Sequence, residues 1–298
     1  MSRGFVTIAT GKDNYYRIAA NLLDSYRLHT TDPMPFALIC DRENRYSDKF
    51  DMTVVIDDPT FSYVDKLRLP EYVPFDETIF IDADCLAYVD LNSFWDLFEG
   101  AGEFSVFGRN YPLDYEYGWF KREDTGKYKD EIQYIPDFIG GVYYLRKGER
   151  LEEFYALVKD ILSTYHDYTF RQFTEPADEP VFALAMAVCG FKTAGDKSPD
   201  ICFYPHATYF ESDISSGLVR FTDRYYLDRG IIPMAYMVHW GSGNTKDPVY
   251  LKEEFRLRTL TRGHSLSSAK MGTATAGIYL YHAARKVYGR LKRVFGKN

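Results

Sequence analysis

The sequence contains no hydrophobic run long enough to span a membrane, no low-complexity segment and no repeat of fixed period. A transmembrane helix needs about 20 mostly apolar residues, and solenoid or propeller folds leave a visible period. These absences exclude both classes. Hydrophobic residues make up 46% of the 298 positions, which is enough for a substantial core. The length fits one large α/β domain or two small ones.

Cysteine is also scarce. The four cysteines, Cys40, Cys85, Cys189 and Cys202, form no CxxC pair, and a chain of this size does not need disulfides to fold. We therefore expect a reducing compartment. The first four residues lead straight into a strand-like segment, without the apolar stretch of a signal peptide. The sequence predicts a cytoplasmic protein with no transmembrane helix.

Acidic residues are missing from the last part of the sequence. The net charge is −7, yet residues 255–298 hold ten Lys or Arg and no Asp or Glu, so the preceding body carries about −17. Because nucleic acid is itself anionic, we expect no nucleic-acid partner. After Gly263 a linker rich in Ser, Ala and Thr leads into an expected helix at 274–295, whose basic and apolar residues suit an anionic membrane surface. The alternative is a solvated or self-packed terminal helix.

Short apolar, β-branched runs alternate with helical patterns along the body. The expected strands are Phe5–Thr10, Pro35–Cys40, Val54–Ile56, Thr78–Ile81, Val142–Leu145 and Ala235–Val238, and the expected helices are 14–29, 149–165 and 179–189. This alternation predicts an α/β fold, a mostly parallel sheet with helices on both faces. Three of the strands are followed by Asp, at Asp41, Asp57 and Asp82. Ligands of such sheets bind beyond the carboxyl ends of the strands, so we expect the functional site at that edge.

The Asp82-Ala83-Asp84 motif directly follows the apolar strand at 78–81. Alternate residues of an extended chain point the same way, so these two carboxylates can share one divalent cation. Carboxylate oxygens suit Mn²⁺ or Mg²⁺, with water and phosphate oxygens in the remaining positions. Such a metal would offset the charge of a diphosphate leaving group. The alternative is a pair of surface carboxylates that cap the next helix.

A second polar segment, His239 to Lys246 (HWGSGNTK), follows another expected strand. Imidazole is a competent metal ligand. Gly241 and Gly243 let backbone N–H groups approach a phosphate, and Lys246 can neutralise a phosphate oxygen. A structural histidine is the alternative.

Aromatic residues make up 17% of the chain and gather at 111–134 without a clear period. We interpret this stretch as a long loop, and long loops in compact domains are usually functional. Tyr and Trp present both an apolar face and a polar group, which suits a sugar. Tyr115, Tyr117 and Trp119 are therefore candidates for binding an acceptor. A loop packed on its own aromatics is the alternative.

Two segments together resemble a known family. Ser62–Pro70 (SYVDKLRLP) followed by Thr78–Leu86 (TIFIDADCL) resembles glycosyltransferases of the GT-A fold. The chain is most similar to glycosyltransferase family 8, which includes bacterial lipopolysaccharide galactosyl- and glucosyltransferases and the glycogenins. Phe138–Val142 resembles that family's Asn-Ser-Gly-Val segment, Asp178-Glu179 its Asp-Gln pair, and His239–Lys246 its His-x-x-Gly-x-x-Lys element. Motif order and spacing match over residues 5–248, which implies a GT-A domain at 1–262 and a basic tail at 263–298.

The resemblance implies roles for individual residues. It makes Asp82, Asp84 and His239 the metal ligands. Asp178 would contact the donor sugar, and Glu179 would lie on its reactive face. The implied nucleotide-sugar contacts are Thr7, Ala9, Thr10, Asp41, Lys66, Arg68, Asp82, Ala83, Gly140, Gly141, Gly241, Gly243 and Lys246.

The chain departs from the family pattern at three places. Ile139-Gly140 stands where the family has Asn-Ser, and Glu179 stands where it has Gln. The last element has one extra residue between His239 and Lys246. Donor-sugar contacts can therefore differ from those of the family. The role of Glu179 stays open between a base, a covalent nucleophile and a helix-capping carboxylate.

We therefore expect a metal-dependent hexosyltransferase that uses Mn²⁺ or Mg²⁺. It would move glucose or galactose from a UDP-sugar to a hydroxyl of a glycan or glycoconjugate, with retention as the resemblance implies. One alternative is a HAD-type phosphohydrolase, but its Asp-x-Asp-x-Thr loop usually opens the domain and has Thr where Leu86 stands. A catalytically inactive sugar-binding protein is another alternative. A nucleotidyltransferase is the third, although an early Gly-rich triphosphate loop is missing.

Overall fold

The computed structural model describes the backbone of residues 1–295 and the side chains of residues 1–288. The chain forms two compact units, each assembled from separate segments. The first comprises Met1–Ala20, Asp32–Ala83 and Leu91–Pro199. The second comprises Asn21–Thr31, Asp84–Asp90 and the chain from Asp200 onward. The backbone passes from the first unit to the second inside the Asp-Ala-Asp motif.

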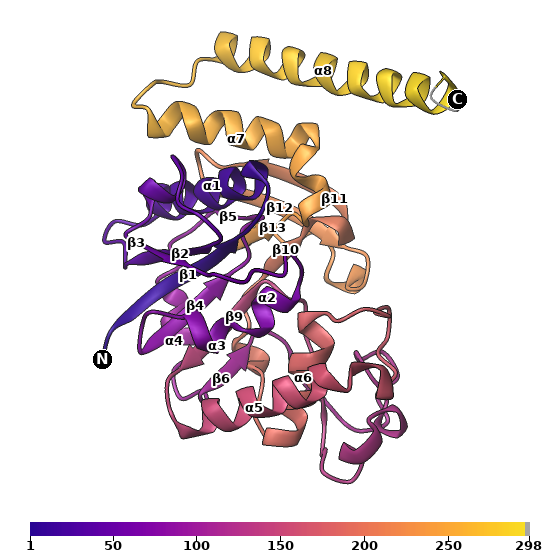
Figure 1. The fold of residues 1–298 in the computed structure, drawn as a ribbon. Helices are drawn as coiled ribbons and strands as arrows, with labels where there is room; N and C mark the ends of the chain where they lie inside the picture. The colour runs from indigo at the N-terminus through magenta and orange to yellow at the C-terminus, as the bar shows by residue number, and fades with distance from the viewer. Residues whose placement is uncertain (296–298) are drawn as a thin grey trace. The chain divides into compact units, whose positions relative to one another are not determined.

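A six-stranded sheet lies in the first unit (Figure 1). The strand order is β3 (Met52–Val55), β2 (Phe36–Cys40), β1 (Arg3–Ala9), β4 (Glu77–Ile81), β9 (Val142–Arg146) and β6 (Phe104–Val106). The first four strands are parallel, and β9 runs antiparallel to both of its neighbours. The predicted mostly parallel sheet is confirmed. Five of its strands match the expected ones to within two residues, and β6 was not predicted.

Helices pack on both faces of this sheet. The helices of the unit are α2 (Val64–Leu67), α3 (Leu69–Tyr72), α4 (Ser93–Leu97), α5 (Glu149–Ser163), α6 (Asp178–Cys189) and the first part of α1 (Asp13–His29). Val6 of β1 belongs to a core shared with α5 and α6. Phe5 packs against Trp95 of α4 instead, with 5.6 Å between ring centroids. Neighbouring residues of a strand point to opposite faces, so strands covered on both sides are mostly apolar, as the continuous runs indicated.

The aromatic segment at 111–134 is mostly irregular, as predicted. It lies between the paired strands β7 (Arg109–Tyr111) and β8 (Ile135–Asp137), and holds two short 3₁₀ helices, η2 (Arg122–Asp124) and η3 (Gly126–Tyr128). Its aromatics partly pack on one another, because the Tyr111 and Tyr115 rings stack at 3.8 Å between centroids.

The second unit has a small sheet, a hairpin and two C-terminal helices (Figure 1). Its strands are β5 (Cys85–Ala87), β10 (Ile201–Phe203), β11 (Ala207–Asp213), β12 (Leu218–Asp223) and β13 (Met237–His239), and its helices are α7 (Pro248–Thr261), α8 (Ser268–Phe295) and the second part of α1. In the sheet, β13 pairs with β10 and β5. The expected strand at 235–238 is β13.

Helix α7 and the β11–β12 hairpin were not predicted. Asp247 caps α7 by accepting a hydrogen bond from the Val249 N–H at 2.9 Å, and Pro248 occupies the first turn. Glu253 on the buried face of α7 accepts a hydrogen bond from the Ile214 N–H at 2.7 Å and pairs with Arg256 at 2.6 Å. A buried acidic residue breaks the apolar period on which helix prediction from sequence depends.

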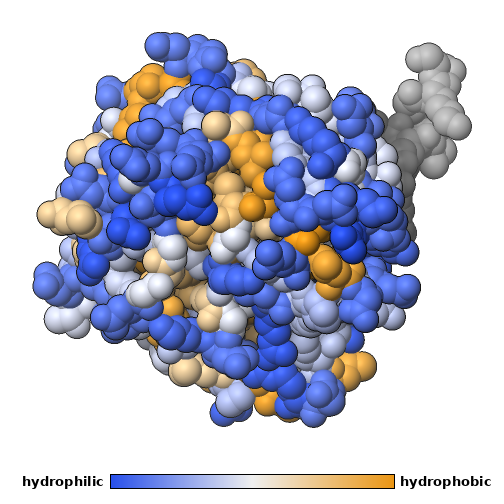
Figure 2. All heavy atoms as spheres, turned by 90° about the horizontal axis from the view of Figure 1, so that it is seen from below, coloured by the Kyte–Doolittle hydropathy of each residue, from blue (hydrophilic) through white to orange (hydrophobic). Residues whose placement is uncertain are grey.

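Helix α8 begins six residues before the expected start at 274 and runs to Phe295. Tyr279, Leu280, Tyr281, Val287 and Tyr288 expose half or more of their surface. Arg290, Lys292 and Arg293, basic residues of the helix expected at 274–295, lie outside the described side chains. Within the described residues no helix is both long and apolar enough to cross a bilayer. The face drawn in Figure 2 is mostly hydrophilic, with hydrophobic residues in small separate patches.

Candidate active site

A charged cluster lies at the carboxyl end of β4. The Lys66 Nζ of α2 is 3.1 Å from the Asp82 carboxylate and 2.8 Å from the Asp178 carboxylate. The Tyr143 hydroxyl of β9 donates a hydrogen bond to the same Asp178 oxygen. The neighbouring Glu179 accepts a hydrogen bond from the Gly140 N–H at 2.9 Å. All six residues belong to the first unit.

The sheet register brings these residues together. In the antiparallel β4–β9 pair, Ile81 lies opposite Val142, and the Asp82 N–H donates to the Gly141 carbonyl at 2.9 Å. This pairing places Gly140 and Gly141 beside the Asp82-Ala83-Asp84 motif (the DAD motif). A Cβ on Gly140 would lie 2.7 Å from the Tyr143 hydroxyl and 3.0 Å from Glu179. A side chain at position 140 would therefore push these groups apart.

Carboxylates outnumber cations in this cluster. Side-chain exposure is 15% for Lys66 and Asp82 and 2% for Asp178. Burial alone would lower the pKa of Lys66, but the carboxylates of Asp178 and Asp82 outweigh it and raise the pKa well above its ordinary value. Burial, and then the nearby Asp178 carboxylate, raise the pKa of Glu179 to about 7, against the lowering effects of Lys66 and the Gly140 N–H. The cluster thus holds one permanent cation against two or three carboxylates.

In the second unit, Asp84 and His239 form a pair. The His239 Nε2 lies 3.2 Å from the Asp84 carboxylate, and both side chains are nine-tenths buried or nearly so. Strand pairing sets this geometry, because His239 lies opposite Cys85 in the β13–β5 ladder and the Trp240 N–H donates to the Asp84 carbonyl at 3.0 Å. The Phe203 ring of β10 covers the imidazole at 5.1 Å between centroids.

Ligand atoms of Asp84, Cys85 and His239 lie within 4.8 Å of one another, close enough to hold a metal ion. A carboxylate oxygen and an imidazole nitrogen together suit Mn²⁺, whereas a thiolate would favour a softer metal. Cys85 is fully buried beside the pair. We therefore regard the oxygen and nitrogen atoms of Asp84 and His239 as the pair that fits a hard divalent cation.

The geometry of the DAD motif differs from the sequence-based expectation. Residues 83 and 84 form a turn between β4 and β5, so Asp82 and Asp84 are not alternate residues of one extended strand. The turn ends β4 and directs the chain into β5, which pairs with β13. Asp82 bonds to Lys66 and Asp84 to His239.

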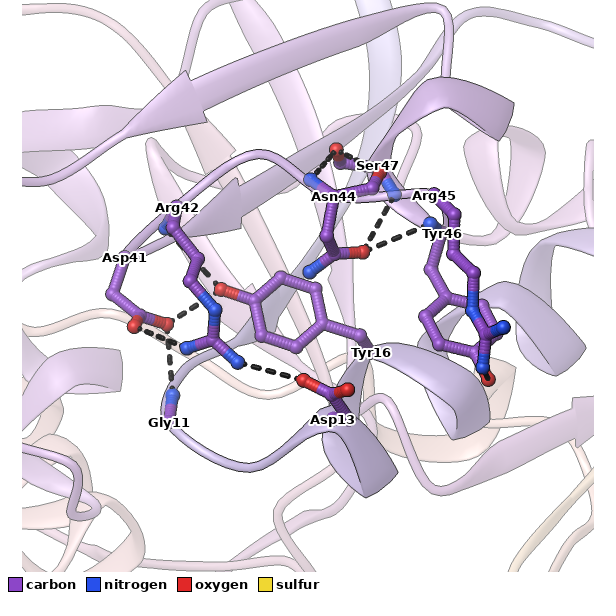
Figure 3. A network of polar contacts seen from close by, with 9 residues as sticks. All are labelled: Gly11, Asp13, Tyr16, Asp41, Arg42, Asn44, Arg45, Tyr46 and Ser47. Atoms are coloured by element: carbon purple, nitrogen blue, oxygen red, sulfur yellow. Dashed lines mark hydrogen bonds and ion pairs between the residues drawn. The ribbon is translucent and has the colours of Figure 1, made fainter.

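A third polar network surrounds Asp41, which follows β2 (Figure 3). Its carboxylate accepts hydrogen bonds from the Gly11 N–H at 2.8 Å and from the Tyr16 hydroxyl at 2.5 Å, and pairs with Arg42 at 2.8 Å. Arg42 also reaches Asp13 at 2.8 Å and lies over the Tyr16 ring at 5.0 Å. Burial would raise the pKa of Asp41, but the hydrogen bonds from Tyr16, Gly11 and Arg42 lower it below its ordinary value. Asp41 is therefore held ionised.

The other predicted donor contacts are more dispersed. Thr7 and Ala9 are buried within β1, while Thr10 donates to Asp65 at 3.4 Å. Arg68 pairs with Asp58 and Glu71 at 3.0 and 3.1 Å, and so differs from Lys66, which faces the Asp82 and Asp178 carboxylates. Ala83 is half-buried, and Lys246 is exposed at the end of the short helix η8 (Ser242–Lys246), which begins after Gly241 and includes Gly243.

The predicted acceptor residues differ in accessibility. Tyr117 exposes 69% of its surface. The Trp119 indole N–H donates to the Phe138 carbonyl at 3.0 Å, and the Tyr115 hydroxyl donates to Asp137 at 3.3 Å. Burial raises the pKa of Asp137 to about 6, although Tyr115 and Arg171 lower it. Tyr117 is thus the most accessible ring of the three.

Sequence reasoning missed three residues that shape these networks: Tyr16, Asp65 and Tyr143. Each lies within an ordinary-looking helix or strand, and two of them are among 26 tyrosines. Their roles come from partners 25 to 55 positions away along the chain, such as Asp41 for Tyr16, Thr10 for Asp65 and Asp178 for Tyr143. Only the Asp residues that follow strands β2 and β4 gave a local signal.

Comparison with known proteins relates this architecture to solved structures. No family model and no curated protein sequence matches the chain. A structure of the galactosyltransferase LgtC in complex with donor and acceptor sugar analogues aligns with 91% of this chain and 99% of its own, at a TM-score of 0.54 and 15% identity. The chain shares the fold of LgtC. It thus has the glycosyltransferase fold that the resemblance implied.

Two further structures show weaker similarity. The alignment with an active-site Gln-to-Glu variant of LgtC covers 80% of this chain and 87% of the variant, with a TM-score of 0.48 and 15% identity. The alignment with the bifunctional glycosyltransferase WbbM covers 82% of this chain and 46% of WbbM, with a TM-score of 0.47 and 12% identity.

Proposed function

We propose that this chain is a metal-dependent glycosyltransferase. It moves a hexose from a nucleoside diphosphate sugar, with UDP-glucose or UDP-galactose as the first candidates, to a hydroxyl of a glycan or glycoconjugate. The observation that carries the proposal is the Lys66–Asp82–Asp178–Glu179 cluster, which lies at the carboxyl end of β4 in a fold shared with a galactosyltransferase. That enzyme was solved with donor and acceptor sugar analogues bound.

The metal site of the proposal consists of Asp84 and His239, with Asp82 as the third ligand by the family resemblance. Bound there, Mn²⁺ or Mg²⁺ would act as a Lewis acid that stabilises the departing diphosphate. Lys66 adds a permanent positive charge to that leaving group, and Lys246 with the backbone of Gly241 and Gly243 supplies further donors. Positive charge placed where negative charge develops is the main catalytic aid available here.

The donor sugar is proposed to bind against Asp178, Glu179 and the Gly140-Gly141 backbone. Asp178 already accepts hydrogen bonds from Lys66 and Tyr143, so it is fixed in place and can accept another from a sugar hydroxyl. Ala83, the middle residue of the motif, is half-buried, and its small side chain adds little bulk there. Retention at the anomeric carbon remains a proposal taken from the family resemblance.

The decisive test of this function is release of a nucleoside diphosphate. Purified protein is incubated with a panel of UDP-sugars and Mn²⁺, and UDP is measured with and without EDTA. We expect release with at least one UDP-glucose or UDP-galactose donor and none after chelation. Phosphatase activity without any release from a nucleotide-sugar would instead support the HAD-type alternative.

The pH dependence of turnover tests the role of Glu179. Its raised pKa, about 7, means that the carboxylate form increases as the pH rises from 6 to 8. If the carboxylate assists the transferring sugar, kcat/KM rises over this range with an apparent pKa near 7. Glu179→Gln should lower kcat/KM about 10²-fold and remove that rise. Identical pH profiles for the two proteins would limit Glu179 to a structural role.

The acceptor is proposed to bind on the exposed aromatics of the 111–134 loop. Tyr117→Ala is expected to raise the acceptor KM about tenfold, because an exposed ring supplies a stacking face for a sugar. Donor hydrolysis without acceptor should stay unchanged. An equal loss in both assays would show that the ring maintains the fold of the loop.

The C-terminal helix is proposed to attach the protein to an anionic membrane surface. Exposed rings and aliphatic side chains on α8 accompany Arg285 and Lys286, and each basic residue near such a surface contributes about 1 kcal/mol. Removal of residues 265–298 should abolish co-sedimentation with phosphatidylserine vesicles while UDP release persists. Unchanged co-sedimentation of the shortened chain would refute this attachment.

A further inference from the structure

Phe61 has an unusual backbone conformation. It is one of two non-glycine residues with positive φ among those described, with φ at 56°. A bulky side chain rarely occupies this left-handed region, because its Cβ crowds the backbone. The residue is also 62% exposed, so burial does not compensate for the strain. Strain of this kind is often found where a ligand is bound.

The buried carboxylate of Asp65 holds Phe61 in this conformation. Asp65 is 2% exposed. It accepts hydrogen bonds from the Thr60 N–H at 2.7 Å, the Thr60 hydroxyl at 2.8 Å and the Phe61 N–H at 3.1 Å. It also accepts one from the hydroxyl of Thr10, which follows β1, at 3.4 Å. These bonds tie the strained loop to the carboxyl end of β1.

The ring lies beside the Asp41 network. A Cβ on Gly11 would lie 3.2 Å from the Phe61 ring, so the ring packs directly on the Gly11 backbone. Gly11 has φ at 81° and donates its N–H to Asp41 at 2.8 Å (Figure 3). Gly11 therefore lies between the aromatic ring, which it contacts, and the ionised Asp41 carboxylate, to which it donates, at the ends of β1 and β2.

The same short segment also supplies the phosphate partner of the proposed function. Lys66 follows Phe61 by five residues, and its side chain points into the Asp82–Asp178 cluster. One loop and one helical turn thus present a flat apolar ring at one end and a cation at the other. A nucleoside diphosphate has a matching order of groups, with an aromatic base at one end and phosphates at the other.

We infer that Phe61 is a preformed stacking platform for the nucleobase of the donor. This inference rests on the proposed function and adds a residue that sets affinity for the nucleotide. A ring held in place by the backbone before the ligand arrives loses little freedom on binding. Stacking on it is tolerant of base identity, because every nucleobase has a π-face. Asp41, which accepts the Gly11 N–H, and its partner Arg42 would bond polar atoms of the base or ribose.

The experiment compares binding of a nucleoside diphosphate with binding of inorganic pyrophosphate, both with Mn²⁺, by calorimetry. The probe is whichever of UDP, ADP and GDP the wild-type protein binds most tightly. Phe61→Leu keeps apolar bulk without a π-face and should weaken that probe about tenfold. Phe61→Tyr keeps the ring and should bind as the wild type does. Affinity for pyrophosphate should be the same in all three proteins.

Two further variants control for folding. Phe61→Gly relieves the positive φ and should weaken the probe as Phe61→Leu does, without a lower Tm. Tyr209→Ala removes another exposed aromatic residue, which lies in the second unit. It should change neither the affinity for the nucleoside diphosphate probe nor the affinity for pyrophosphate.

Four results would overturn the inference. The first is Phe61→Leu binding the probe as tightly as the wild type. The second is a parallel loss of probe and pyrophosphate binding together with a lower Tm, which would make the ring structural. The third is a loss confined to the UDP-sugar and absent for UDP, which would place the sugar on the ring. A folded wild-type protein that binds no nucleoside diphosphate would refute the proposed donor, and the platform with it.

Discussion

Replacing Asp84 by Asn is expected to lower kcat/KM about 10³-fold at saturating Mn²⁺, the scale of loss when a main source of electrostatic stabilisation is removed. Asn has nearly the same shape as Asp but no negative charge. The Asp84 carboxylate lies 3.2 Å from the His239 Nε2. The amide of the substituted Asn can therefore still bond to the imidazole, and the fold should be maintained. The loss is therefore expected in metal affinity and turnover, with a Tm close to that of the wild type.

Electron paramagnetic resonance measures Mn²⁺ binding directly and so separates a loss of metal affinity from a loss of turnover. The Asp84→Asn protein should bind Mn²⁺ at least tenfold more weakly than the wild type, in the presence of UDP. Asp228→Asn is the matched control, because Asp228 is an exposed carboxylate in the same unit and should leave both quantities unchanged. Full turnover by Asp84→Asn with intact Mn²⁺ affinity would refute the metal site.

Asp82→Asn examines the proposed third ligand separately. Asp82 bonds to Lys66 as well, so its replacement is expected to affect the charge cluster and the metal together. A fall in Mn²⁺ affinity similar to that of Asp84→Asn would support direct ligation. A fall in turnover at unchanged Mn²⁺ affinity would assign Asp82 to the Lys66 cluster alone.

The central strands of the sheet were predictable because they are covered on both faces. Every residue of β2 and β4 is buried, and such strands appear in sequence as mostly apolar runs. The hairpin β11–β12 gave no such signal, because its exposed Tyr209 and Glu211 and its buried Ser212 mix apolar and polar residues on each face. Pairing across the hairpin, with Glu211 opposite Arg220 in register, supplies what the sequence pattern does not reveal.

The site was predictable where a strand positions the residue directly. Asp41 and Asp82 immediately follow β2 and β4, so their place at the edge of the sheet follows from the strand boundaries. The turn at Ala83 was not predictable from the motif, because it depends on β5 pairing with a strand some 150 residues later. Tyr143 escaped notice for the same reason, since its partner Asp178 lies 35 residues away.

Lys66→Met is expected to lower kcat/KM about 10²- to 10³-fold and to destabilise the fold by about 2–4 kcal/mol. Methionine has a similar length without the charge. Asp178 is only 2% exposed, and removal of its cation leaves a buried carboxylate paired only with the Tyr143 hydroxyl among the contacts described above. Breaking such a pair costs more than the pair contributes, because the remaining charge stays desolvated.

A double variant separates stability from catalysis. Lys66→Met combined with Asp178→Asn removes both charges, so urea unfolding should recover most of the lost stability. Turnover should stay low, because the cation that stabilises the leaving diphosphate and the carboxylate that contacts the donor sugar are both absent. Lys66→Arg keeps the charge in a larger, planar group and should retain part of the activity. If the double variant regained wild-type turnover, Lys66 would serve only to neutralise Asp178, and the leaving-group role proposed for it would be wrong.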